Sequence, residues 1–378
     1  MGDGAGSSVS SSPARRRHLS RLTLRRFRSH SALDLDLTAR PIALYGPNGA
    51  GKTNILEAVS LLAPGRGLRG AKAEELAQRP DPIGWSVKGR LEEGAGAAAE
   101  IAVQMDLRPG APDHGKRRVT LDGAPVSQTA LAARLKTLWL TPAMDRLWIE
   151  GPSERRKFLD RLTLAFDPEH GARAARYERA MRERNRLLKE GGAAPAWLSA
   201  LEARMAEEGA ALSQARLAAV AELAAAQEAG ESAFPKAELS LAPAEGPLFQ
   251  EVEALAAALA GARGRDAAAG RALLGPHRDD LEAIYAAKDM PARSASTGEQ
   301  KALLISLVLA AARALTLRGA AAPILLLDEV AAHLDEGRRA ALYDELTALG
   351  AQAWLTGTGP ELFEALGPRA DRLALSGG

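Results

Sequence analysis

The sequence predicts an α/β core built from both ends of the chain, with a helical second lobe inserted between them. Three observations lead to this fold class. A glycine-rich loop lies at residues 46–53, an apolar run near the other end of the chain ends in Asp328 and Glu329, and residues 143–271 have a helical pattern. Because buried parallel strands read as continuous apolar runs, both ends are expected to contribute strands to one sheet.

The phosphate-binding loop reads GPNGAGKT and matches the pattern G-x-x-x-x-G-K-[ST] at every fixed position. Residues 41–45 predict a buried strand before it, and the apolar spacing of residues 54–62 predicts a helix after it. Glycines let backbone N–H groups approach a phosphate, and the helix N-terminus adds unpaired donors. We therefore expect a nucleoside triphosphate to be bound by Gly46, Pro47, Asn48, Gly49, Ala50, Gly51, Lys52, Thr53 and Asn54.

Four side chains are expected to carry the chemistry. Lys52 should reach the β- and γ-phosphates as a catalytic residue, and the Thr53 hydroxyl should ligate Mg²⁺. The apolar run 323–327 predicts a buried strand that places Asp328 beside the loop, where it can hold the Mg²⁺ shell. Glu329 then lies where a catalytic base can polarise the attacking water.

Composition sets few further limits. The chain has 378 residues, enough for two or three domains, and a net charge of +2. It contains no cysteine, which excludes disulfides, thiolate zinc sites and cysteine nucleophiles and fits a cytosolic protein. We expect no membrane span, because no apolar run approaches the roughly 18 residues that one requires.

The N-terminus is basic: residues 1–30 contain seven arginines and one acidic residue, Asp3. We expect residues 1–18 to be a disordered basic tail, since residues 1–12 are rich in Gly and Ser. The arginines are compatible with a nucleic-acid footprint or with an organellar transit peptide. A start codon placed too far upstream would also explain such a tail.

The rest of the chain predicts two lobes. Residues 22–27 and 32–37 predict an antiparallel strand pair, and the alternating runs between residues 85 and 122 predict a β-meander. We assign residues 19–142 and 272–378 to a nucleotide-binding lobe and residues 143–271 to a helical insertion lobe. The insertion is too short for a long coiled-coil arm.

One helix of the insertion is rich in charge. Its basic side chains are compatible with a face for DNA phosphates. The favoured alternative is a solvated helix face neutralised by Glu178, Glu183 and Glu190. The basic residues in question are Arg179, Arg182, Arg184, Arg186 and Lys189.

A second anion site is predicted upstream of the apolar helix 302–312, where Ser296 can cap the helix. One phosphate does not need two such loops from one subunit. The arrangement resembles the signature motif S-x-G-[EQ] of ABC-type ATPases, which contacts the γ-phosphate held by the opposite subunit. By that resemblance Ser296, Thr297, Gly298, Glu299 and Gln300 act in trans, and Asp335 belongs to the D-loop. An ordinary capped helix is the alternative.

Two features depart from ABC transporters. Thr356 or Thr358 stands where transporters carry a histidine after a late strand, and no Q-loop glutamine is identified. Both departures argue against a transporter subunit.

Three segments are not generic to ABC-type ATPases, and they resemble the RecF family in the SMC-like branch. They are residues 151–160, 184–188 and 275–281, and residues 27–29 and 46–62 match that family as well. The resemblance implies an ABC-type ATPase head with an inserted helical lobe, ATP and Mg²⁺ as cofactors, and a weak DNA-stimulated ATPase. No chemistry of residues 275–281 follows from the sequence.

The resemblance also implies a biological setting. RecF-like proteins form ATP-dependent homodimers around two ATP molecules and bind double-stranded DNA near single-strand junctions. They work with RecR and RecO to load RecA in the bacterial cytoplasm, at the nucleoid, and slow hydrolysis resets them. Alternatives are a structural ATP-gated DNA-binding protein with negligible turnover and another SMC-like ATPase. The position of Glu329 favours turnover over the structural alternative.

Overall fold

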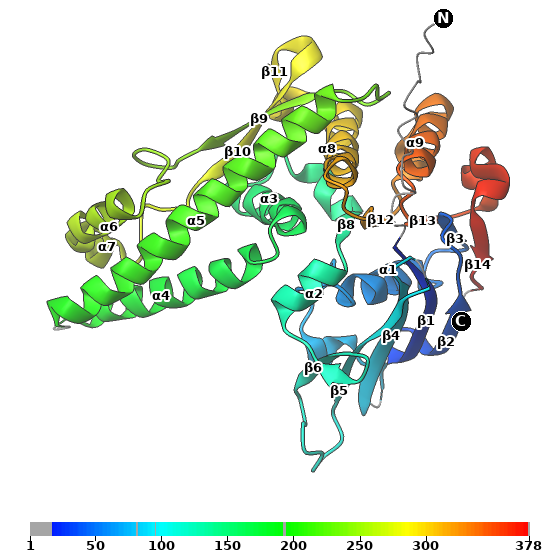
Figure 1. Cartoon of the computed structure of the whole chain (residues 1–378), viewed down its shortest axis with the longest axis horizontal. Helices are drawn as coiled ribbons and strands as arrows, with labels where there is room; N and C mark the ends of the chain where they lie inside the picture. Colours follow the sequence, from blue (N-terminus) through cyan, green and yellow to red (C-terminus); the bar gives the residue numbers. More distant parts are fainter. Residues whose placement is uncertain (1–16, 81, 95, 192–193, 377–378) are drawn as a thin grey trace, which may run out of the picture.

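The computed structural model describes residues 17–80, 82–94, 96–191 and 194–376 (Figure 1). Most of the expected N-terminal tail lies outside the described residues. His18, its last residue, already belongs to the first strand, β1 (His18–Phe27). Two sheets and their helices form one lobe, and long helices extend away from it on one side as a second lobe (Figure 1).

The central sheet is parallel and combines strands from both ends of the chain, as the sequence predicts. Its strand order is β14-β3-β13-β12-β8. All four residues of β12 are buried, in agreement with its continuous apolar run. The strands are β3 (Ile42–Tyr45), β8 (Thr137–Leu140), β12 (Ile324–Leu327), β13 (Ala353–Gly357) and β14 (Asp371–Ala374).

The second sheet is the predicted antiparallel meander, in the order β2-β1-β4-β5-β6-β7. A turn at Asp122 and Gly123, both with positive φ, joins its last two strands. Helix α1 (Lys52–Leu61) lies between the two sheets, and its apolar residues share one cluster with both. The remaining strands are β2 (His30–Asp36), β4 (Gly84–Glu92), β5 (Ala98–Asp106), β6 (Arg117–Leu121) and β7 (Ala124–Pro125).

The other face of the central sheet is covered by α8 (Thr297–Leu317) and α9 (Glu336–Ala348). Alternation along the strands divides the core: Leu326 packs toward α1, whereas Leu325 and Leu327 pack toward α8. Helix α8 is long and apolar enough to cross a membrane, contrary to our expectation that no segment is. However, 83% of its apolar window is buried inside the protein, as in a core helix.

The insertion is not wholly helical, which corrects the prediction for residues 143–271. Its strand β9 (Ala237–Ala242) pairs with β10 (Asp280–Tyr285), and β10 pairs with β11 (Met290–Pro291). This small sheet crosses the predicted boundary at residue 271. The helices are α3 (Pro152–Phe166), α4 (His170–Glu190), α5 (Pro195–Glu228), α6 (Val252–Gly261) and α7 (Arg263–Ala269).

The insertion also divides between two cores. Parts of α4, α5 and α6 form their own apolar cluster, which we call the arm core. In contrast, Phe158 and Leu162 of α3 and Leu223 of α5 pack into the cluster around α8. The arm is thus anchored through both α3 and the second half of α5.

Short segments complete the chain. Helix α2 (Gln128–Arg134) precedes β8, and Ser127 caps it. The 3-10 segments are Ala73–Leu76, Pro142–Arg146, Ala286–Lys288, Ala292–Ser294, Ala331–His333 and Pro360–Arg369.

Candidate nucleotide-binding site

The phosphate-binding loop connects β3 to α1, and its glycines are required by geometry. Gly46, Gly49 and Gly51 all have positive φ. A Cβ on Gly46 would lie 2.1 Å from the Leu375 carbonyl oxygen, and one on Gly51 would lie 2.6 Å from His30 Nε2. A Cβ on Gly49 would meet nothing within 4 Å, so this backbone is open on one side. The loop therefore has room for a group that approaches its backbone.

Lys52 folds back over the loop. Its side chain is buried, and Nζ donates hydrogen bonds to the carbonyl oxygens of Gly46 at 2.7 Å and Pro47 at 2.9 Å. The ammonium thus lies above the loop at the N-terminus of α1. A phosphate in the loop would meet both this cation and the unpaired N–H groups of the helix.

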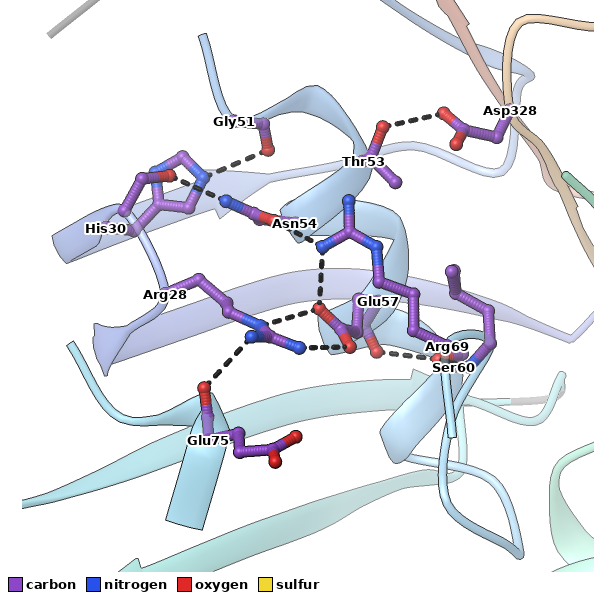
Figure 2. A network of polar contacts seen from close by, with 12 residues as sticks. Arg28, His30, Gly51, Thr53, Asn54, Glu57, Ser60, Arg69, Glu75 and Asp328 are labelled. Carbon is purple, nitrogen blue, oxygen red and sulfur yellow. Dashed lines mark hydrogen bonds and ion pairs between the residues drawn. The ribbon is translucent and has the colours of Figure 1, made fainter. Parts of the chain in front are cut away.

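The two expected Mg²⁺ ligands meet although they lie 275 positions apart in the chain. Thr53 Oγ1 donates to Asp328 Oδ1 at 3.0 Å (Figure 2). Asp328 directly follows β12 and is buried, and its backbone N–H donates to Leu140 at the end of β8. The structure therefore brings together the two halves that were predicted from separate ends of the sequence.

This pair fits Mg²⁺ better than a metal with an all-protein shell. Among the described residues, no group of three or more His, Cys, Asp or Glu side chains is placed to hold a metal. Mg²⁺ usually takes one or two carboxylates and completes its shell with water and phosphate oxygens. Thr53 and Asp328 would hold the ion on the protein side, next to the loop.

Thr356 in β13 links Asp328 to Glu329. Its hydroxyl is buried, donates to Asp328 Oδ1 at 2.8 Å and accepts the Glu329 backbone N–H at 2.8 Å. Thr358, the other candidate for this position, is exposed. The structure thus places Thr356 beside both acids.

A cleft of about 930 Å³ opens beside the acids, between the segment after α1 and helix α3. Thr53, Asp328 and Glu329 line one end of it, and Arg161 of α3 lines another part. The Arg161 guanidinium lies 4.4 Å from the centroid of the Trp139 ring and donates to the Trp139 carbonyl at 3.4 Å. Burial lowers the pKa of Arg161 to about 9. The pattern of the sequence did not indicate this residue.

Sequence reasoning also missed a polar network behind the loop (Figure 2). Glu57 of α1 is fully buried, and its carboxylate accepts two hydrogen bonds from Arg28, at 2.8 and 2.9 Å. Arg69 donates to Glu57 at 3.2 Å and to Asn54 at 2.9 Å, and Asn54 donates to Ser29. The network ties α1 to the β1–β2 turn. No local pattern of the sequence indicates this network, because its residues come from three separate segments of the chain.

The signature segment caps α8 in this protomer. The Ser296 hydroxyl and the Glu299 carboxylate form a reciprocal capping box, as the alternative of a capped helix predicts. Hydrogen bonds from Lys288 and Ser296 lower the pKa of Glu299 to about 2. Gln300 is buried and donates to the Ala295 carbonyl. Ser296, Thr297 and Gly298 are exposed, and Asp335 caps α9.

None of these signature residues shares a hydrogen bond or ion pair with residues 46–54 within the described parts of the chain. A role in completing a site on another subunit therefore stays a prediction. The roles of Lys52 and Glu329 in catalysis also stay predictions.

Two of the three segments that set this sequence apart from generic ABC-type ATPases, residues 151–160 and 275–281, contact each other. Arg155 of α3 donates two hydrogen bonds to Asp280, at 2.7 and 2.8 Å, and Arg156 donates to the Asp279 carbonyl. Arg216 of α5 bonds both Asp160 and the Pro276 carbonyl. We call this group the arm junction. It fixes the return segment 275–280 to the start of the insertion.

Two groups at the arm junction have shifted pKa values. Burial raises the pKa of Asp279 to about 6, against the opposing charges of Arg216 and Arg156. Burial likewise lowers the pKa of His277 to about 4, and Tyr177 shares a 2.8 Å hydrogen bond with its Nδ1. The structure thus supplies a structural role for a segment whose sequence gave none.

The charged helix α4 agrees with the favoured alternative of a neutralised face. Arg182 pairs with Glu178, and Arg186 pairs with Glu183 and Glu190. Arg184 is fully buried and lies between Glu202 and Asp266, with nitrogen–oxygen distances of 2.9 and 2.7 Å. Three of the five predicted basic residues of α4 are thus paired with acids, and Arg179 and Lys189 are exposed.

Comparison with known proteins agrees with this arrangement. The family model described as the RecF/RecN/SMC N-terminal domain matches residues 18–366. The chain is 48% identical to the DNA replication and repair protein RecF of Rhizobium meliloti, over 95% of this chain and 97% of that protein. It is 49% identical to the RecF of Caulobacter vibrioides, over 92% and 94%.

Solved structures share the fold. The recombination mediator protein RecF of the RecFOR pathway, solved with ATP, superposes with a TM-score of 0.76 at 24% identity, over 92% of this chain and 94% of that one. The Smc head domain of Pyrococcus furiosus superposes with a TM-score of 0.51 at 16% identity, over 92% of each chain. At these identities the likeness concerns the ABC-type head fold alone.

Proposed function

Because this chain belongs to the RecF family of DNA replication and repair proteins, within the RecF/RecN/SMC group, we propose that it is an ATP-dependent DNA-binding clamp of recombinational repair and replication restart. The observation that carries this proposal is the meeting of Thr53 with Asp328 beside an open phosphate-binding loop. That meeting joins both ends of the chain in one candidate ATP and Mg²⁺ site.

In this proposal the loop and Lys52 hold the phosphates, while Thr53 and Asp328 hold Mg²⁺. Glu329 lines the adjoining cleft, where it can accept a proton from the attacking water. Mg²⁺ supplies charge neutralisation at the phosphate oxygens when bound. The resulting activity is a weak, DNA-stimulated ATPase whose slow turnover resets the clamp.

We further propose that ATP drives homodimer formation. Ser296, Thr297 and Gly298 are exposed at the N-terminus of a helix 21 residues long. A γ-phosphate held by another subunit would give this anion-binding end a ligand. The dimer should therefore form with ATP and not with ADP, because only ATP supplies that phosphate.

The proposed partners are double-stranded DNA and single-strand/double-strand junctions, together with RecR and RecO, and RecA indirectly. DNA contacts should go mainly to phosphates, so the affinity should fall with added salt. Since Arg182 and Arg186 of α4 pair with glutamates and Arg184 is buried, we do not assign DNA to that face. We place the protein in the bacterial cytoplasm, at the nucleoid.

Sedimentation with a duplex that carries a single-stranded gap tests the proposal. The protein should be dimeric and DNA-bound with ATP and Mg²⁺, and monomeric with ADP or without nucleotide. Lys52→Ala should abolish ATP binding, whereas Ser296→Ala should keep it and weaken the dimer. The nearby exposed Ser294→Ala is the control and should behave like the wild type. A monomer under every condition would refute the clamp.

The alternative to an ATPase is a structural ATP-gated DNA-binding protein with negligible turnover, and an experiment can distinguish the two. The position of Glu329 at the cleft favours turnover instead. Phosphate release measured with DNA should vanish in Glu329→Gln while the ATP-bound dimer persists. If wild-type protein and Glu329→Gln release phosphate equally slowly, the structural alternative is correct.

A further inference from the structure

We propose that Thr356 is a positioning residue for ATP hydrolysis, because its one hydroxyl orients both the Asp328 carboxylate and the Glu329 backbone. This inference rests on the proposed ATPase function. It assigns a role to Thr356, whereas the roles of Asp328 and Glu329 are those proposed above.

Strand register puts Thr356 in this place. Leu355 of β13 lies opposite Leu327 of β12, so the next residues along, Thr356 and Asp328, are also neighbours. On its other side Thr356 lies opposite Leu44 of β3, two residues before the phosphate-binding loop begins. The hydroxyl is therefore held between the strand that leads into the loop and the strand that carries the acids.

The direction of each hydrogen bond is determined. A threonine hydroxyl has one hydrogen to donate, and a backbone N–H can only donate. Because the Glu329 N–H donates to Thr356 Oγ1, the hydroxyl hydrogen is directed to Asp328 Oδ1. Thr356 is fully buried, so water does not compete for these bonds.

The first consequence concerns Asp328. Its Oδ1 accepts hydroxyl hydrogens from both Thr53 and Thr356, at 3.0 and 2.8 Å. Its Oδ2 accepts no hydrogen bond from the described residues. Two donors on one oxygen fix the rotation of the carboxylate and leave the other oxygen for the Mg²⁺ shell. Without Thr356, only the Thr53 hydroxyl would hold that rotation.

The second consequence concerns Glu329. Asp328 and Glu329 follow the end of β12, and their side chains both line the same cleft. The Glu329 backbone is left-handed there, with φ of 54°. Such a conformation is uncommon for a residue other than glycine and requires support from its surroundings. The Thr356 oxygen supplies it by accepting the N–H of the same residue.

The experiment compares Thr356→Val, which keeps the branched shape and removes the hydroxyl, with Thr356→Ser, which keeps the hydroxyl. Thr358→Val is the matched control, because Thr358 is exposed and lies two residues away. We would measure kcat and KM for ATP, the affinity for a fluorescent ATP analogue without Mg²⁺, and the Mg²⁺ concentration that half-saturates nucleotide binding.

For Thr356→Val we expect kcat to fall at least about tenfold, the equivalent of losing one positioned hydrogen bond to a charged group. The half-saturating Mg²⁺ concentration should rise several-fold, whereas the Mg²⁺-free affinity should change less than about twofold. Thr356→Ser should restore both quantities to within about threefold of the wild type. Thr358→Val should match the wild type.

A second pair of variants tests the inference if the first substitution prevents folding. If Thr356→Val does not fold, as judged by circular dichroism, Thr356→Ala and Thr356→Ser are compared, since they differ by one oxygen atom. The inference is overturned if Thr356→Ser is as impaired as Thr356→Val or Thr356→Ala, which would indicate a packing role. It is also overturned if the Mg²⁺ midpoint does not move.

The two proposals fail differently. A wild-type protein that binds ATP with Mg²⁺ but does not turn it over would refute the ATPase, and the Mg²⁺ midpoint would still decide whether Thr356 orients Asp328. A wild-type protein that binds no ATP would overturn both.

Discussion

Arg184 is expected to hold the arm together, and replacing it by methionine tests this directly. The guanidinium is fully buried and donates to Glu202, to Asp266 and to the Leu259 carbonyl, all within 2.9 Å. It thereby joins α4 to α5, α6 and α7. Met has a similar length and no charge, so Arg184→Met leaves two buried carboxylates without their shared cation.

Removing one partner of a buried ion pair costs about 3–5 kcal/mol, because the remaining charge is left without compensation. Glu202 keeps Arg263, whereas Asp266 pairs with no other cation among the described residues. The loss of stability should be confined to the arm, because the arm has its own apolar cluster. Amide exchange in α4 and α6 should then accelerate by about a hundredfold to a few thousandfold.

Hydrogen exchange measured by mass spectrometry gives the opening free energy of each helix. Arg186→Met is the matched control: it lies on the same helix, its ion pairs are exposed, and its effect should stay below about 1 kcal/mol. ATP affinity should be unchanged in both variants. Equal exchange in Arg184→Met and Arg186→Met would refute the reasoning, and loss of ATP binding would show that the two cores do not open separately.

Two further perturbations follow from the geometry. For Asp279→Asn, the sign follows from a pKa that burial raises from 3.8 to about 6. The stability that wild-type Asp279 gains by holding its proton is complete below its unfolded pKa and is lost as the pH rises through about 6. The unfolding free energy of Asp279→Asn, taken relative to that of the wild type, should therefore increase between about pH 4 and 6 and level off above pH 6. Urea titrations of both proteins at several pH values measure this difference. A difference in unfolding free energy that does not change with pH would contradict the prediction. Gly46→Ala should weaken ATP binding at least tenfold, as measured by isothermal titration calorimetry, because its Cβ would clash with the Leu375 backbone oxygen, which cannot move aside easily. Gly70→Ala is the control, since Gly70 also has positive φ but its added Cβ would meet nothing within 4 Å. Equal losses of affinity in both variants would show that backbone strain alone is responsible.

The sequence predicted the structure best where a local pattern is compatible with only one arrangement of the backbone. The phosphate-binding loop and the apolar run before Asp328 each required a strand, and parallel strands meet at their carboxyl ends. The meeting of Thr53 with Asp328 could therefore be predicted without any coordinates. The capping of α8 by Ser296 followed from local chemistry in the same way.

Other features depend on contacts between distant segments, which no local pattern records. Glu57 sits in a helix where an acid usually faces solvent, and only the packing of α1 between two sheets makes it buried. Strand β9 was hidden in a helical region because its partner, β10, lies beyond the expected boundary. Thr356 could not be chosen over Thr358 from the sequence, because only the end of β13 at Gly357 leaves Thr356 buried in the sheet and Thr358 exposed beyond it.

The interleaving of the two chain ends has a consequence for synthesis on the ribosome. Both neighbours of β3 in the sheet, β13 and β14, are made last, and Leu19 bonds a side chain 333 positions later. While the middle of the chain is emerging, the apolar strand Ile42–Tyr45 has no parallel partner and both of its edges are open. Folding of this lobe must therefore wait for the final strands, and chaperones that cover exposed edges would matter most during that interval.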